Sequence, residues 1–162
     1  MARLTLSAVP GPQREIILRH QAQAPVKIGA IAADLGVKVL ISDLPLAVSG
    51  TLSRDKDDRE KWIIRVNRHE HKNRQRYTIA HEIAHFVLHR DAIDNELIDD
   101  TFYRSGLSER REYEANALAA EILMPWSLIR SIMSEGNVSA TQLARQLEVS
   151  EAAMHIRLGL PT

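Results

Sequence analysis

The segment from residue 73 to 89 constrains the fold more than any other part of the chain, because it combines two patterns on one helix. Its apolar residues recur at helical spacing, as expected for a face packed against a core: Ile79, Ile83, Phe86 and Val87. Beside them stands the H-E-x-x-H sequence His81-Glu82-Ile83-Ala84-His85. The chain is therefore predicted to bury one face of this helix and to open the histidine face to a cleft.

The spacing of the two histidines suits a metal ion. Side chains four residues apart on a helix lie one turn apart on the same face, so His81 and His85 can bind one zinc ion together. Glu82 stands about 100° further round the helix, within reach of a water in the open coordination position. The pattern predicts His81 and His85 as metal ligands and Glu82 as the base that takes a proton from this water.

A catalytic zinc site needs a third protein ligand, and the composition limits which residue types can provide it. The chain of 162 residues has no cysteine, which excludes thiolate ligands, disulfides and a cysteine nucleophile. His89 continues the four-residue series, but it is two turns from His81, about 12 Å along the helix axis, and is expected on the surface. Asp91 would need a glycine at position 88 to turn the chain back, and Leu88 stands there.

A downstream helix offers a better source of the third ligand. Glu112 and Asn116 are four residues apart on it, so one of them could bind the metal while an amide oxygen accepts a proton from a ligand histidine. This is the gluzincin layout, in which the third ligand comes from a second helix.

Further motifs accompany the histidine pair. They are Val66-Asn67, Arg74 to Thr78 leading into Ala80 to His85, and the segment from Glu112 to Pro125. Together these motifs resemble the ImmA/IrrE-type metallopeptidases of bacteria and phages, over about residues 28 to 158. Leu118 stands where that family usually has Phe, which is a change in core packing.

The resemblance implies a function and a ligand set. It places the third zinc ligand at Glu112 and a hydrogen-bonding partner of the ligands at Asn116, and it leaves Glu114 as a surface charge. Members of the family are known or inferred to cleave DNA-binding repressors, which switches on stress or mobile-element genes. We therefore expect a zinc endopeptidase with one Zn²⁺ per chain and a helix-turn-helix repressor as its protein substrate. The alternative is a regulatory or toxin-antitoxin type binding protein with a metal site and weak or conditional proteolysis.

Two other segments have candidate roles near the cleavage site. Tyr103 and Arg104 lie between the two metal helices, where either could donate a hydrogen bond to the developing oxyanion, although a surface loop explains them as well. The strand Trp62 to Asn67 is a candidate sheet edge that pairs with an extended substrate, and an ordinary half-buried strand is at least as good a reading.

The remaining periodicities predict an α+β fold. Strands are expected at residues 37–41, 48–53 and 61–67, the last two forming a hairpin, so that a small three-stranded sheet packs on the histidine helix. The helices are expected to dominate the rest: two within residues 12–36, then residues 73–89, 108–124 and 126–133. Residues 1–136 form the predicted metallopeptidase core.

Residues 137–162 are predicted to form a tail that resembles a helix-turn-helix and packs on the core. Ser139 and Ser150 are suitable N-caps for its two helices, while Glu148 stands where a turn glycine is expected. The second helix has one arginine, and the chain has 21 basic and 21 acidic residues. Direct DNA binding is therefore not expected.

Nothing in the sequence predicts a membrane association. The apolar run at the N-terminus is short and is interrupted by Pro10, Gly11 and Pro12, which does not fit a secretory signal. No stretch reaches the length of about 18 apolar residues that spans a bilayer. A cytoplasmic location is the resulting expectation.

Overall fold

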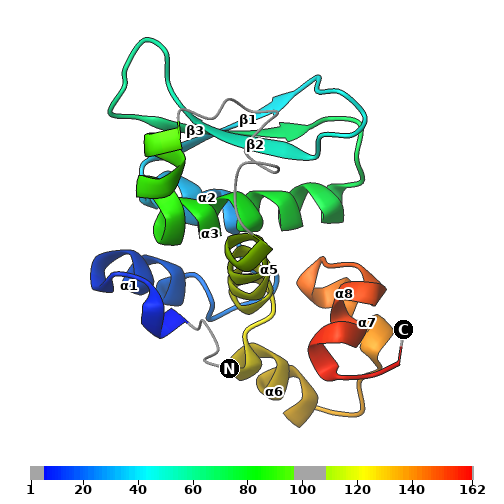
Figure 1. The fold of residues 1–162 in the computed structure, drawn as a ribbon. Coiled ribbons are helices and arrows are strands. Elements are labelled where there is room, and N and C mark those ends of the chain that lie inside the picture. Colours follow the sequence, from blue (N-terminus) through cyan, green and yellow to red (C-terminus); the bar gives the residue numbers. More distant parts are fainter. Residues whose placement is uncertain (1–5, 97–108, 162) are drawn as a thin grey trace.

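Two α-helices precede a small sheet in the first half of the chain, and all the elements described after the sheet are helices (Figure 1). The structure is a computed structural model that describes residues 6–96 and 109–161. After a short 3-10 helix at Leu6–Ala8, its elements are α1 (Gly11–Arg19), α2 (Ile28–Asp34), β1 (Val37–Ser42), β2 (Gly50–Arg54), β3 (Trp62–Asn67), α3 (Lys72–Glu96), α5 (Glu109–Leu123), α6 (Trp126–Ser134), α7 (Ala140–Leu147) and α8 (Glu151–Leu158). The predicted α+β class is confirmed.

The three strands form one mixed sheet in the order β1-β3-β2. β2 and β3 pair antiparallel, as the predicted hairpin requires, and β1 pairs with β3 in parallel. The prediction that Trp62 to Asn67 is a sheet edge is wrong, because β3 is the central strand and its backbone is paired on both sides. The hydrophobic side chains of β3 are buried, which suits a central position.

α3 lies between the sheet and α5 (Figure 1). Its approach to the sheet depends on Gly50, because a Cβ atom there would lie 2.3 Å from Cγ2 of Thr78. On the same side, the rings of Trp62 and Phe86 meet edge to face with centroids 5.9 Å apart. The sheet therefore sets the orientation of the helix that carries the two histidines.

α3 continues to Glu96, beyond the predicted end near residue 89. The sequence from Arg90 onward is polar, but Ile93 is buried and continues the apolar face for another turn. Arg90 also stacks over the ring of Phe86, at 4.6 Å from the ring centroid. Although α3 has 25 residues, neither it nor any other helix in the described part of the chain is long and apolar enough to cross a membrane.

The last two helices pack into the same hydrophobic core as the rest of the described residues, and the buried side chains they contribute are Leu143, Ala144, Leu147, Val149 and Met154. Both predicted serine caps are present. Ser139 forms a capping box with Gln142, and Ser150 accepts from the backbone N–H of Ala153. Glu148 adopts the left-handed conformation, with φ 53° and ψ 50°, at the position where a glycine was expected. The division of the chain at residue 136 stays a prediction.

A buried arginine joins α3 to the turn between α7 and α8. Arg76 is 9% exposed and donates from Nη2 to the carbonyl oxygens of Val26 at 2.9 Å and Leu147 at 3.4 Å. Its Nε donates to the carbonyl oxygen of Glu148 at 3.2 Å. The carboxylate of Glu148 also pairs with Lys72, at 2.8 Å. One cation on α3 therefore fixes the last two helices against the core.

Arg76→Met should lower the free energy of unfolding by about 3 kcal/mol, because three carbonyl groups lose a charged donor in a buried place. Lys72→Ala removes the exposed partner of the same Glu148 and should cost about 1 kcal/mol or less. Urea unfolding followed by circular dichroism measures both values. Equal losses in the two variants would show that Arg76 does not hold the tail.

Candidate metal centre

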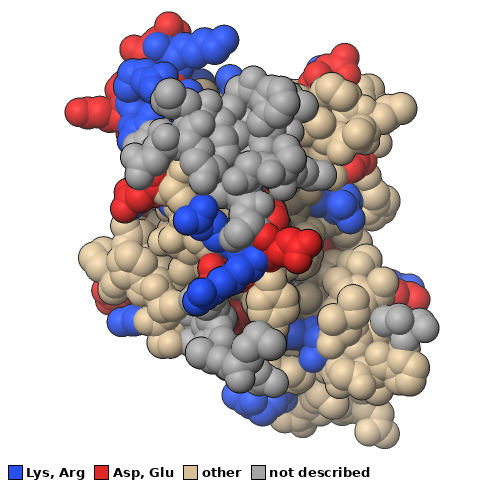
Figure 2. Space-filling model, in the orientation of Figure 1, with Lys and Arg blue, Asp and Glu red and all other residues tan. Residues whose placement is uncertain are grey.

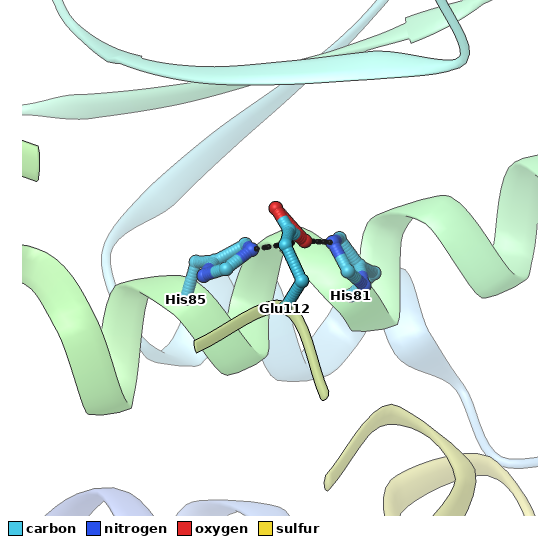
Figure 3. Close-up of side chains that lie close together, drawn as sticks. All are labelled: His81, His85 and Glu112. Atoms are coloured by element: carbon cyan, nitrogen blue, oxygen red, sulfur yellow. Dashed lines mark hydrogen bonds and ion pairs between the residues drawn. The ribbon is translucent and has the colours of Figure 1, made fainter. Parts of the chain in front are cut away.

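Three side chains that are far apart in the sequence meet between α3 and α5. His81 and His85 come from α3 and Glu112 from α5, and their ligand atoms lie within 4.8 Å of one another. Oε2 of Glu112 is 3.1 Å from Nε2 of His81 and 3.3 Å from Nε2 of His85. Figure 3 shows the carboxylate of Glu112 pointing between the two imidazole rings. The predicted ligand set is thus brought together in space.

The surroundings of these groups change their pKa values in different directions. Burial opposes the charged form of His81, but its hydrogen bond to Glu112 and the charges of Glu82 and Glu112 outweigh this, so its pKa is raised above 6.5. Burial is the dominant effect on His85 and lowers its pKa to about 4. Burial would raise the pKa of Glu112, but hydrogen bonds with both histidines lower it to about 2. The carboxylate is therefore ionised across the neutral pH range.

The outward nitrogen of each imidazole also has a partner. Nδ1 of His81 is 3.0 Å from Oδ1 of Asn116, the residue expected to support a ligand. Nδ1 of His85 is 2.9 Å from Nδ1 of His89. When the proton of neutral His81 is on Nδ1 and is donated to Asn116, the lone pair of Nε2 faces the carboxylate of Glu112. Acceptor atoms then face one another, and this donor set fits a cation such as Zn²⁺.

Glu82 is buried beside these three residues but is not one of the converging ligands. Its carboxylate has no exposure, and Oε1 lies 4.0 Å from Nε2 of His81. Glu82 thus borders the place of a metal ion, and it is not one of the three described residues whose ligand atoms converge. The position fits the predicted base.

Two residues that were expected on the surface instead lie near the centre, where His89 is buried and Glu114 is partly buried. His89 is 7% exposed, and its Nε2 lies 2.8 Å from Oε1 of Glu114, whose side chain is 15% exposed. The prediction that both were surface residues is wrong, because α5 packs on α3 beside His89 and covers that residue and Glu114. The four-residue spacing from His85 to His89 was the available signal. Asp91 is exposed and is not among the described residues that converge.

The predicted oxyanion donors, Tyr103 and Arg104, lie outside the described residues. Their role stays a prediction that depends on the sequence alone.

A groove of about 830 Å³ begins one helical turn from His81 and is lined by residues of α3, α5, α6 and α8. Tyr77 lines it, and its hydroxyl group donates to the carbonyl oxygen of Asn116 at 3.3 Å. Tyr113, which directly follows Glu112, lines the same groove, as do the partly or largely exposed Trp126 and Ile156. The metal centre thus has an apolar groove alongside it.

Comparison with known proteins gives a family and two similar sequences. The family model described as the IrrE N-terminal-like domain matches residues 32–159. A radiation response metalloprotease IrrE from Deinococcus radiodurans is 32% identical over 99 residues, which cover 59% of this chain and 30% of that protein. A protein of the same name from Deinococcus deserti is 35% identical over 98 residues, which cover 57% of this chain and 34% of that protein. The matched region is thus about a third of each relative's length.

A solved structure shares the fold. A Mycobacterium tuberculosis transcriptional regulator superposes with a TM-score of 0.63 at 19% sequence identity. The match covers 92% of this chain and 45% of that one. At this identity the likeness concerns the fold alone.

Zinc affinity should decrease as the pH falls through the raised pKa of His81, because a proton and zinc compete for its Nε2. His85 stays neutral down to a pH near 4, so only the proton of His81 competes between the pKa of His81 and pH 4, and two protons compete below pH 4. The logarithm of the affinity should therefore fall by about one per pH unit between the raised pKa of His81 and pH 4, and by about two per pH unit below pH 4. Calorimetric titration with zinc at a series of pH values measures these slopes. An affinity that begins to fall only near pH 4 would contradict a role for His81 as a ligand.

Proposed function

The chain belongs to the family of the IrrE N-terminal-like domain, and from this we propose that it is a zinc-dependent endopeptidase. The observation that carries the proposal is the meeting of His81, His85 and Glu112 between two helices, with the buried carboxylate of Glu82 beside them. The two relatives named as metalloproteases support the activity.

In this proposal His81, His85 and Glu112 hold the zinc ion, and Asn116 fixes the ring of His81 through its Nδ1. When bound, zinc supplies a Lewis acid that polarises the scissile carbonyl and lowers the pKa of a water molecule. Glu82 accepts a proton from the attacking water and then gives it to the nitrogen of the leaving amine. Tyr103 and Arg104 are the proposed donors to the oxyanion.

The proposed substrate is one specific protein, a helix-turn-helix repressor, whose cleavage switches on stress or mobile-element genes. The groove beside the metal centre suits an apolar segment of such a protein, because Tyr77 and Tyr113 join the groove to the two helices that carry the ligands. Repressors act on DNA in the cytoplasm, so the proposal places the reaction there.

The alternative is a regulatory or toxin-antitoxin type protein whose metal site supports weak or conditional proteolysis. A DNA-binding form of this alternative is not favoured by the tail, since Arg157 of α8 donates to the carbonyl oxygen of Met124 and stacks on Trp126. On the face drawn in Figure 2, residues of both charge signs are interspersed and the region of α7 and α8 is mostly uncharged. The buried carboxylate of Glu82 also has a use in hydrolysis that a purely structural site lacks.

Glu82→Gln should keep its zinc and lose cleavage by a factor of about 100 to 10,000, because the amide cannot accept the proton of the attacking water. The measurement pairs zinc content by elemental analysis with mass spectrometry of a helix-turn-helix repressor encoded beside the chain's gene. Glu112→Ala is the contrasting variant and should lose both zinc and cleavage.

A Glu82→Gln protein that cuts as fast as the wild type would exclude this mechanism. If the wild-type protein with its zinc cuts no repressor and binds DNA tightly, the regulatory alternative takes its place.

Ile156→Arg should raise KM for the repressor about tenfold with kcat unchanged, because it places a charge where the groove would bury an apolar side chain. Ile41→Arg is a matched control, since Ile41 is 65% exposed on β1 and does not line the groove. Initial rates over a range of repressor concentrations measure both parameters. Equal KM values in the two variants would exclude the groove as the substrate site.

A further inference from the structure

His89 and Glu114 continue the metal centre outward from His85. We propose that these two residues are positioning residues, which hold the proton of His85 on Nδ1 and thereby direct the lone pair of its Nε2 toward the metal. The inference depends on the metal site alone, so it does not require that the chain cleaves a protein.

The four groups form a continuous chain of close contacts through the interface of α3 and α5. Oε2 of Glu112 is 3.3 Å from Nε2 of His85, whose Nδ1 is 2.9 Å from Nδ1 of His89. Nε2 of His89 is 2.8 Å from Oε1 of Glu114. His85 has no exposure and His89 is 7% exposed, so these contacts are shielded from water. Each contact is within or near hydrogen-bond distance.

The carboxylate of Glu114 determines on which nitrogens His89 and His85 carry their protons. An ionised carboxylate only accepts hydrogen bonds, so the contact with Glu114 requires the proton of neutral His89 to be on Nε2. Nδ1 of His89 is then an acceptor, and His85 must donate to it from its own Nδ1. This leaves the lone pair of His85 on Nε2, the atom that faces Glu112.

The opposite arrangement is disfavoured by the same geometry. If His85 kept its proton on Nε2, a neutral His89 would have to donate from Nδ1 and would turn the lone pair of its Nε2 toward Glu114. Two acceptors would then face each other at 2.8 Å in a partly buried place, with no proton between them. Glu114 therefore selects the tautomer of His85 through His89.

The number of protons on His85 and His89 indicates which contact a cation would occupy. Three contacts link Glu112, His85, His89 and Glu114 in that order, and the two neutral imidazoles supply only two protons for them. When Glu114 and His89 use both, the contact between His85 and Glu112 is left without a proton for its hydrogen bond. A metal ion there supplies the missing positive charge. For His81, the Oδ1 atom of Asn116 is the acceptor that holds the proton on Nδ1, through a single contact of 3.0 Å.

The first test compares two substitutions of His89. His89→Phe keeps a ring of similar size but cannot accept from His85, so zinc affinity should fall by about 10-fold to 100-fold. His89→Gln offers an amide oxygen as an acceptor and should restore most of the affinity. Competition with a zinc chelator measures the affinities, and circular dichroism compares the folds. Equal affinities of the wild type and His89→Phe would overturn the proposal.

The second test observes the tautomer directly. In zinc-loaded protein labelled with ¹⁵N at histidine, NMR should show His85 bound to the metal through Nε2, with a proton on Nδ1 that exchanges slowly with water. In His89→Phe this proton should exchange faster or escape detection. Metal binding through Nδ1 of His85 in the wild type would overturn the proposal.

Glu114 provides an independent test that leaves His89 in place. Glu114→Leu removes the acceptor and should lower zinc affinity as His89→Phe does, whereas Glu114→Gln keeps an amide oxygen and should lower it much less. Arg110→Ala is the matched control, because Arg110 contacts the other oxygen of Glu114 at 3.5 Å and its side chain is 87% exposed. A Glu114→Leu protein with the zinc affinity of Arg110→Ala would overturn the proposal, whether or not any of these proteins cleaves a repressor.

Discussion

The burial of α3 between the sheet and α5 is the constraint on which the rest of the structure depends. Within six residues the helix contacts three other parts of the protein. Arg76 holds the turn between α7 and α8, and Tyr77 reaches α5 at the carbonyl oxygen of Asn116. Thr78 lies against Gly50 of the sheet, and His81, the first candidate metal ligand, follows three residues later. The helix is fixed from several sides before its first candidate ligand, so the fold positions the backbone that carries the two imidazoles.

Much of this arrangement could be predicted from the sequence, because it depends on local spacing. The four-residue interval between His81 and His85 defines one face of a helix wherever that helix packs, and serine caps such as Ser139 act within one turn. The family resemblance is confirmed by the match to the IrrE N-terminal-like domain, and it implies Glu112 as the third ligand, the residue that faces both histidines in the structure.

The rest depends on contacts between segments that are far apart in the chain, which periodicity does not reveal. β3 is a central strand because β1 pairs with it across an intervening segment, and its own residues could equally belong to an edge. The resemblance placed the ligand at Glu112 and left Glu114 as a surface charge, yet the packing of α5 on α3 brings Glu114 to His89. Arg76 belonged to a basic stretch in the sequence, and only the fold places it beside Val26 and Leu147.

The same contacts that fix α3 also shape the groove next to the metal centre. The groove is lined by α8 and by the start of α6 as well as by the two ligand-bearing helices, so its far wall exists only while the tail is docked. Arg76 from α3 and Arg157 from α8 both donate to backbone carbonyl oxygens across this junction, at Glu148 and Met124. A polar backbone group that is buried needs such a donor, and each arginine therefore stabilises the packing of α7 and α8 on the rest of the protein. In the proposed function the tail has a use that requires no DNA, because it completes the surface on which a protein segment would lie as it approaches Glu82.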